Sequence, residues 1–262
     1  MSKNPCIYLI ADYGTGDLAF AEVIQRFKTL LPAAEIYPLS TSPFSTLNTG
    51  FIIAQLAVWN PSRNIFIFSN TAPRRDDKKS RYENEGEKFK YAKLVNGVEI
   101  CGVDAGWCFS FVKPFIEEFR LINVKNNGSQ FRSRDFYPQV TAAIINDKKE
   151  KLFGPLVPIK CIPPIPKNRI MYIDGYGNLK TTVRYKSVKF KPGSRIRIVI
   201  NHIYQSGYYA NGNFSVKSGD MAFAPGSSGG SNPFMEIFLR SGNAAKLFQN
   251  PPVETKFRIE AV

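Results

Sequence analysis

Two carboxylates flank a glycine-rich turn near the start of the chain. The segment Ala11-Asp12-Tyr13-Gly14-Thr15-Gly16-Asp17-Leu18-Ala19 leaves an apolar run and enters a helical pattern. Its glycines fit the G-x-G-x-x-A pattern of a nicotinamide oxidoreductase, but acids at a helix N-terminus would repel the pyrophosphate. Asp12 and Asp17 suit a ribose diol, or a cation such as an ammonium or sulfonium. Asp17 also has the residue type and position of a helix cap.

A second turn gathers an acid, an aromatic ring and an amide within five residues. It contains Asp174, Tyr176 and Asn178, and it follows a short apolar run at residues 170–173. An asparagine can pair with an adenine edge, a tyrosine ring can cover apolar surface, and Asp174 can take a cationic group. An ordinary Asn/Gly turn between two strands fits the same residues.

The formal charge of +14 points toward an anionic partner, because clustered Lys and Arg attract phosphate. The basic residues are nevertheless spread along the chain, with modest concentrations at residues 74–81, 148–151 and 186–197. The sequence has neither the aromatic motif of an RNA-binding sheet nor a continuous basic helix stripe. We therefore expect a small-molecule ligand and no nucleic acid.

The cysteines and the histidine argue against metal chemistry. Cys6, Cys101, Cys108 and Cys161 lack C-x-x-C pairing, and His202 is the single histidine. We therefore expect no zinc site, no disulfide framework and no histidine-based triad. No apolar run approaches the roughly 20 residues that span a bilayer, and the N-terminal apolar run does not have the form of a signal peptide. We expect a cytoplasmic protein without membrane contact.

Residues 1–154 alternate short apolar runs with helical patterns, as parallel βα units do. We predict strands at residues 6–10, 36–39, 65–68 and 98–103, and helices at residues 18–31, 46–59, 107–119 and 138–146. The charged stretch 70–90 is predicted to be a long loop at the carboxyl end of a buried strand. The expected fold class is α/β, with a mostly parallel sheet and flanking helices.

A proline-rich segment at residues 155–167 separates this region from a different one. Five prolines fall within residues 155–166, which suits a linker. Beyond it, β-rich runs at residues 170–173, 194–200 and 257–259 alternate with Gly, Asn and Ser clusters. We therefore predict an α/β domain at residues 1–154 and an all-β, barrel-like domain at residues 168–262.

Taken in order, five segments resemble the S-adenosylmethionine hydroxide adenosyltransferase family, which includes the fluorinases and chlorinases. Their sequences are Asp12-Tyr-Gly-Thr-Gly-Asp17, the run from Asn96-Gly97 to Val103-Asp104-Ala-Gly106, Phe131-Arg-Ser-Arg-Asp-Phe-Tyr-Pro138, residues 173–182, and Met235-Glu-Ile with Ala244-Ala-Lys-Leu247. The resemblance spans most of the chain.

The resemblance implies a homotrimer with each site between the α/β domain of one subunit and the β-barrel domain of its neighbour. S-adenosylmethionine is then the substrate, and no cofactor is implied. By matched position, Asp12 would hold the ribose diol, Asn178 would bind the adenine and Tyr176 would pack nearby. The residues expected at the methionine end are Asp17, Asp174 and Ser231, and Asn70 and Asn232 complete the substrate-binding set.

The chain departs from the family at its catalytic segments. Water-using members carry Asp-Pro-Gly followed by Arg, and Phe-His-Gly-Arg-Asp. This chain has Asn70-Thr-Ala-Pro73 and Phe131-Arg-Ser-Arg-Asp135 instead, so the Asp and the His are absent. The candidate catalytic residues are then Arg132 and Ser133, which could bind an anion or water, with Arg75 replacing the family arginine.

Three functions follow from the resemblance. The first is hydrolysis of S-adenosylmethionine to adenosine and L-methionine, by attack of water or hydroxide at the ribose 5′ carbon. The second is binding of an adenosyl compound without catalysis, because the catalytic Asp and His are replaced. The third is a halide-using reaction, since Ser133 matches the serine of the fluorinase segment Phe-Tyr-Ser-Arg-Glu.

Overall fold

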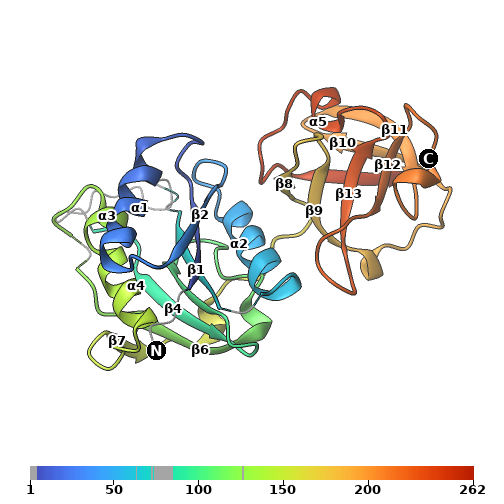
Figure 1. Cartoon of the computed structure of the whole chain (residues 1–262). Helices are drawn as coiled ribbons and strands as arrows, with labels where there is room; N and C mark the ends of the chain where they lie inside the picture. Colours follow the sequence, from blue (N-terminus) through green and yellow to red (C-terminus); the bar gives the residue numbers. More distant parts are fainter. Residues whose placement is uncertain (1–4, 63, 72, 74–84, 126) are drawn as a thin grey trace. The chain divides into compact units, whose positions relative to one another are not determined.

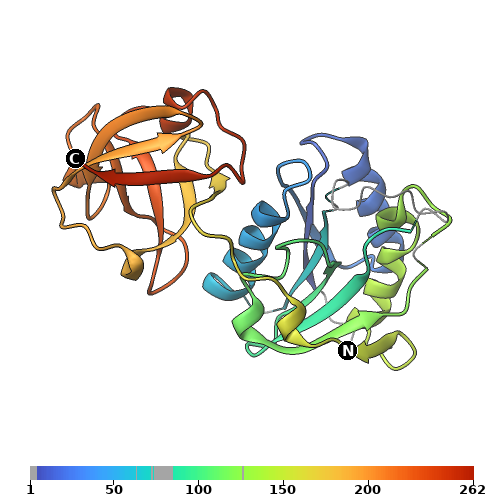
Figure 2. The same ribbon diagram turned by 180° about the vertical axis from the view of Figure 1, so that it is seen from behind.

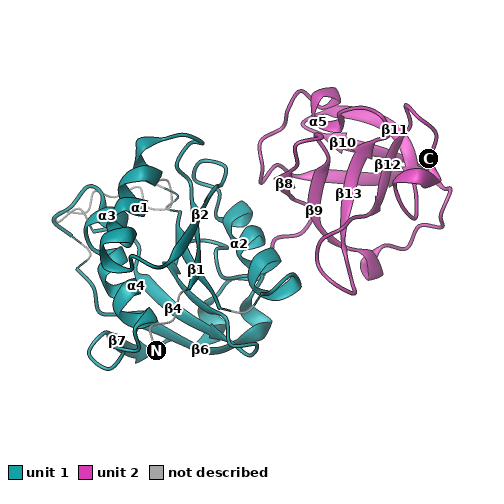
Figure 3. Cartoon of the chain, viewed as in Figure 1, with its two compact units in different colours: residues 1–164 teal, residues 165–262 magenta. Residues whose placement is uncertain are grey.

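The computed structural model describes residues 5–62, 64–71, 73, 85–125 and 127–262. The chain divides into two compact units, residues 1–164 and 165–262 (Figure 3). The division falls inside the proline-rich segment 155–167. Among the described residues, each unit is built on one seven-stranded sheet.

The N-terminal sheet has the strand order β2-β1-β3-β5-β4-β6-β7. Its strands are β1 (Cys6–Ala11), β2 (Glu35–Ser40), β3 (Ile65–Asn70), β4 (Phe89–Leu94), β5 (Glu99–Val103), β6 (Ile116–Ile122) and β7 (Phe153–Leu156). The first four strands in this order are parallel, and β4, β6 and β7 add antiparallel pairs. The α/β class is confirmed, although half of the strand pairs are antiparallel.

Helices cover both faces of this sheet (Figures 1 and 2). They are α1 (Leu18–Leu30), α2 (Thr46–Ala54) with a π-helical extension (Gln55–Trp59), α3 (Arg132–Asp135) and α4 (Tyr137–Ile145). Helix α1 buries Phe20, Val23 and Phe27, which share one side at helical spacing. These side chains and the buried residues of α4 join one core cluster with β1 and β3. Helix α2 lies on the opposite face.

The helix predicted at residues 107–119 is wrong. Residues 104–112 are largely turns, a 3-10 turn spans Lys113–Phe115, and β6 follows. Residues 108–112 are all buried within these turns. Pro114 also lacks an N–H for a continuing helix. The sequence pattern likewise did not predict β4, β6 or β7, and β4 begins inside the stretch expected to be a loop.

The C-terminal sheet has the order β14-β10-β11-β12-β13-β9-β8. Its strands are β8 (Ile170–Ile173), β9 (Leu179–Arg184), β10 (Arg195–Ile200), β11 (Ile203–Tyr209), β12 (Met221–Pro225), β13 (Phe234–Leu239) and β14 (Phe257–Ala261), with a short helix α5 (Ala244–Leu247). The strand pairs are antiparallel except β11–β12. The curled sheet agrees with the predicted all-β, barrel-like fold.

The first and last strands of this sheet meet. Arg169 and Lys256 form an antiparallel bridge. Beside it, the Ile170 N–H donates to Thr255 O at 3.0 Å and the Phe257 N–H donates to Asn168 O at 3.1 Å. These bonds join the edges of β8 and β14, so the sheet closes at one end around its core. Within the described ranges, no helix has the length and apolar character needed to cross a membrane.

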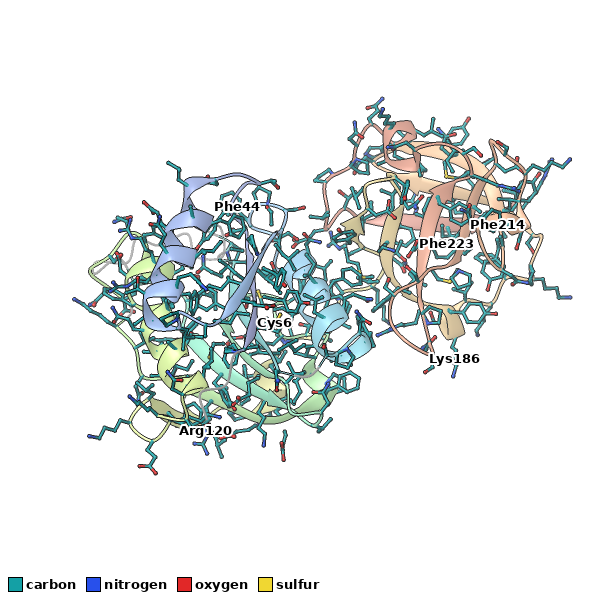
Figure 4. The ribbon with its side chains drawn as sticks, viewed as in Figure 1. Cys6, Phe44, Arg120, Lys186, Phe214 and Phe223 are labelled. Carbon is teal, nitrogen blue, oxygen red and sulfur yellow. The ribbon has the colours of Figure 1, made fainter. Side chains whose placement is uncertain are left out.

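Two phenylalanines of the C-terminal unit give a matched test of this core (Figure 4). Phe223 is 2% exposed and packs edge-on against Phe257, whereas Phe214 is 85% exposed. We expect Phe223→Ala to lower the free energy of unfolding by about 3–5 kcal/mol through lost burial and a residual cavity. Phe214→Ala should change it by less than about 0.5 kcal/mol. Urea unfolding of both variants by circular dichroism checks this, and equal effects would contradict the described core.

Candidate functional site

The carboxyl ends of three parallel strands lie level at one edge of the N-terminal sheet. Ala11 of β1 pairs with Ser40 of β2 and with Asn70 of β3. The next residue, Asp12, donates its backbone N–H to Asn70 O at 3.3 Å. Its carboxylate Oδ2 accepts the backbone N–H of Phe44 at 3.1 Å. The loop after β2 and the turn after β1 are therefore joined through Asp12.

Phe44 was not expected at this site. Its backbone has φ of 61°, a left-handed conformation that bulky residues rarely adopt, and its side chain is 39% exposed (Figure 4). The hydrogen bond to Asp12 stabilises this conformation. Strained backbone conformations cluster at binding sites, so Phe44 joins Asp12 as a candidate ligand contact. Neither its residue type nor its neighbours in the sequence signals this conformation.

Tyr13 links three segments that are far apart in the sequence. Its hydroxyl is hydrogen-bonded to Ser133 Oγ and accepts from Asn70 Nδ2 at 3.2 Å. Its ring packs edge-on against Phe20 and Phe131, with centroids 5.0 and 5.9 Å away. Burial raises the pKa of Tyr13 well above its usual range, and the hydrogen bonds from Ser133 and Asn70 offset only part of this shift. The phenol therefore stays protonated.

The three polar groups form a hydrogen-bonded chain, which we call the donor chain. Asn70 donates to the phenolic oxygen, and either of the Tyr13 and Ser133 hydroxyls can donate to the other. Where Tyr13 donates, the Ser133 O–H can serve a further acceptor. Ser133 is 3% exposed, and a buried hydroxyl donor is worth more than an exposed one because water competes less. This end of the site is suited to an anion or to a water oxygen.

Arg132 and Ser133 are neighbours in α3, but their described contacts differ. The guanidinium of Arg132 donates to Ser129 O at 3.3 Å and is hydrogen-bonded to Tyr137. Burial raises the pKa of Tyr137, and Arg132 opposes this shift. Tyr137 itself stacks on Phe89 at 4.1 Å. The contacts of Arg132 and Tyr137 therefore stabilise the packing around α3.

The other two candidates of this unit are separate from the donor chain. Asp17 is exposed, and its Oδ1 accepts the Ala19 N–H at 2.8 Å as the N-cap of α1. The cap interpretation therefore has direct geometric support, while its substrate role stays a prediction. Arg75 lies outside the described residues. Among the described residues, no group of three His, Cys, Asp or Glu could hold a metal ion.

In the C-terminal unit, Asp174 organises the predicted turn from within. Its Oδ1 accepts the backbone N–H groups of Tyr176 at 2.9 Å and Asn178 at 3.0 Å. Its Oδ2 accepts the side-chain amide of Asn178 at 3.0 Å. The Asn178 amide group thus keeps its carbonyl oxygen for another donor, and the Tyr176 ring is 80% exposed. The turn is rigid before any ligand arrives.

Asp174, Tyr176 and Asn178 line a cleft of about 610 Å³. A buried ion pair, Lys180 with Glu236, also lines it, with side chains 12% and 11% exposed. Glu236 accepts the Ser227 N–H at 3.3 Å as well, so the pair ties strand β13 to the loop that follows β12. Sequence reasoning missed this pair, because its partners are 56 residues apart.

Ser231 and Asn232 lie in a loop whose backbone is bound by a half-buried arginine. Arg184 donates to Gly229 O at 3.0 Å and to Asn232 O at 2.8 Å, and its guanidinium lies 3.5 Å from the Phe234 ring centroid. Burial lowers the pKa of Arg184 to about 10. Asn232 Oδ1 accepts the Lys186 N–H at 3.0 Å, whereas Ser231 is exposed. Arg184 therefore fixes the backbone that presents Ser231.

Residues 168–254 match the sequence family described as the SAM hydroxide adenosyltransferase C-terminal domain. This part of the chain therefore carries the C-terminal domain of the SAM hydroxide adenosyltransferase family. The match confirms the family resemblance over the last two of the five ordered segments, and it supports an enzyme that acts on S-adenosylmethionine. A search of curated protein sequences finds no significant match.

Two solved structures share the fold. An uncharacterized conserved protein from Thermotoga maritima superposes with a TM-score of 0.75 at 16% identity, covering 97% of this chain and 99% of that one. A conserved hypothetical protein from Thermus thermophilus gives 0.68 at 15% identity, with 97% and 99% covered. At such low identity, these similarities establish the architecture alone.

The role of Arg184 can be tested by substitution. Arg184→Met should lower the free energy of unfolding by about 1–3 kcal/mol, because two carbonyl oxygens lose a charged donor. Arg184→Lys should lose less, since it keeps the charge but cannot make both bonds in the same planar geometry. Lys186→Met is the matched control, because Lys186 is exposed and only its backbone contacts the loop. Urea unfolding measures all three, and a control as destabilised as Arg184→Met would refute this role.

Proposed function

We propose that the protein hydrolyses S-adenosylmethionine by attack of water or hydroxide at the ribose 5′ carbon. The new C–O bond forms as the C–S bond breaks, the sulfur keeps the bonding electron pair, and adenosine and L-methionine result. Attack by water also releases one proton, whereas attack by hydroxide releases none. The observation that carries this proposal is the donor chain from Asn70 through Tyr13 to Ser133, beside Asp12. It offers a place for an electron-rich oxygen close to a carboxylate that suits a ribose diol.

The donor chain also indicates what kind of nucleophile the site favours. Tyr13 stays protonated, and neither a serine nor an asparagine takes up a proton near neutral pH. These three groups can orient an oxygen nucleophile and stabilise negative charge on it, but they cannot remove a proton from water. Hydroxide from solvent is therefore the nucleophile we assign, with positioning and desolvation as the contribution of the protein.

The substrate would be held from both units. Asp12 would accept two hydrogen bonds from the ribose diol, and the Phe44 ring would cover apolar surface beside it. In the C-terminal cleft, the carbonyl oxygen of Asn178 would accept the adenine amino group and Tyr176 would cover the base. Asp174 and Ser231 would hold the methionine end. These units would come from neighbouring subunits of a homotrimer, as the family resemblance implies.

Two observations favour other outcomes of the same site. Asn70 and Arg132 occupy the segments where water-using members carry Asp and His, which favours an adenosyl-binding protein without turnover. A buried serine hydroxyl that can donate to an anion also suits a halide, which favours a halide-using reaction. The experiments below separate these outcomes from hydrolysis.

Binding and turnover are measured first. We expect S-adenosylmethionine to bind by isothermal titration, and chromatography of the same sample to show adenosine and methionine in equal amounts. Asp12→Asn should weaken binding about tenfold or more, because a charge-assisted contact to the diol is lost. Asp17→Ser keeps a residue that caps a helix, so any loss of binding in this variant would come from the predicted contact of Asp17 with the methionine end rather than from the cap. Binding without products would support the non-catalytic alternative, and halide-dependent products would support the third function.

Ser133→Ala and Tyr13→Phe test the donor chain. Ser133→Ala should lower kcat about 100-fold with little change in KM, because the lost donor acts on charge in the transition state. Tyr13→Phe should act in the same direction but less strongly, since Ser133 remains. The wild-type rate should rise with pH as hydroxide becomes available, without a loss from Tyr13 ionisation below about pH 10. A rate that levels off near neutral pH would instead require a general base.

A further inference from the structure

The C-terminal unit carries most of the net charge. Residues 165–262 contain 14 Lys and Arg against 5 Asp and Glu, whereas residues 1–164 contain 21 against 16. The proposed hydrolase site uses little of this charge, because its C-terminal residues are Asp174, Tyr176, Asn178 and Ser231. The excess of basic side chains therefore needs a separate explanation.

Strand β10 places two arginines on one face of its sheet. Its sequence Arg-Ile-Arg-Ile-Val-Ile alternates, and a strand points successive side chains to opposite faces. The isoleucines at 196, 198 and 200 are fully buried in the core. Arg195 and Arg197 therefore point outward, and both are exposed.

The neighbouring strands extend this surface. Val199 of β10 pairs with Tyr204 of β11 on one side and with Arg258 of β14 on the other, so all three share the outward face. Tyr204 is 64% exposed and the Arg258 side chain is 72% exposed. We call Arg195, Arg197, Tyr204 and Arg258 the arginine–tyrosine face.

One carboxylate lies within this face and balances part of its charge. Glu260 is 4.0 Å from Arg197 Nη1 and 3.4 Å from Arg258 Nε. It leaves two excess positive charges among the three arginines, and it reduces the repulsion between the Arg197 and Arg258 guanidinium groups on adjacent strands. The exposed Lys189 and Lys191, just before β10, add further positive charge at its end.

A guanidinium group and an aromatic ring lie close together on the arginine–tyrosine face. The Arg197 guanidinium lies 5.3 Å from the centroid of the Tyr204 ring. An exposed aromatic ring and a guanidinium plane are the two side-chain surfaces on which unpaired bases stack, while the other cations meet the phosphates. A broad sheet face presents such groups to a flexible strand, whereas it does not enter the grooves of a duplex as a helix does.

We propose that the arginine–tyrosine face binds single-stranded nucleic acid. Bases would stack on Tyr204 and Arg197, and Arg195 and Arg258 would contact phosphates. The sequence analysis expected no nucleic-acid partner because the basic residues are dispersed along the chain. The sheet brings residues 195–204 and 258 together, which the linear pattern did not reveal. This binding is independent of the proposed hydrolysis.

Fluorescence anisotropy with the full chain and a labelled 20-nucleotide poly-U RNA or oligo-dT tests the proposal. We expect binding that weakens steeply with salt and exceeds binding to a duplex of the same length. Arg197→Ala/Arg258→Ala should weaken it at least tenfold and reduce the salt slope by about 0.7, which corresponds to the one phosphate contact of Arg258 on a single strand. Tyr204→Ala should weaken binding by about 5- to 100-fold through lost stacking, and Tyr204→Phe should not.

A charge-matched control separates this face from general attraction. Lys148→Ala/Lys151→Ala removes the same charge from exposed positions of the N-terminal unit and should leave binding unchanged. Equal losses in the two double variants, or a duplex bound as tightly as a single strand, would overturn the proposal. So would a change of oligomeric state in Arg197→Ala/Arg258→Ala by size-exclusion chromatography, because the face would then be a contact between subunits. Cleavage of S-adenosylmethionine by both double variants should match the wild type.

Discussion

The register of β1 between β2 and β3 decides where chemistry can occur in the N-terminal unit. The backbone ladder sets Ala11 level with Ser40 and Asn70, so three chain segments leave the sheet at one height. Each segment then supplies a group to the same small region: Asp12 a carboxylate, the loop after β2 a backbone N–H, and β3 a side-chain amide. A slip of one residue would turn every side chain of β1 to the other face and separate these groups.

In both candidate regions, polar groups already have hydrogen-bond partners within the protein before a ligand binds. Tyr13 is fixed by Asn70 and Ser133, and the turn of residues 174–178 is fixed by the carboxylate of Asp174. Arg184 does the same for the loop that presents Ser231. Such groups lose little freedom when a ligand arrives, so more of the contact energy is available for binding.

The sequence predicts the parallel part of the fold better than the antiparallel part. Strands β1, β3 and β5 are short apolar runs separated by helical patterns or turns, and these signals are local. Strands β4 and β6 pair with each other across 22 residues or more, and aromatic runs such as 108–112 read equally well as a helix. Their state is decided by pairing and burial, which a linear pattern does not contain.

The same distinction holds for the site. The sequence alone could identify Asp12, Asp174 and Asn178 as candidates. Each lies in a glycine-rich turn whose residue types indicate a polar binding site. The role of Tyr13 could not be predicted from the sequence, because its hydrogen-bond partner Ser133 is 120 residues away. Arg132 and Ser133 are adjacent in the sequence, and only the geometry distinguishes a donor beside Tyr13 from a guanidinium packed near Tyr137.

The bridge between Arg169 and Lys256 also affects the order in which the two units can fold during synthesis. It joins the first and last strands of the C-terminal sheet, so this sheet cannot close until β14 has left the ribosome. The N-terminal unit has no such dependence, because all of its strands precede residue 165. During synthesis, the first unit can therefore be complete while β8 still exposes an unpaired edge. That edge, in the interval before β14 arrives, is where a nascent chain of this fold is most vulnerable to pairing with another molecule.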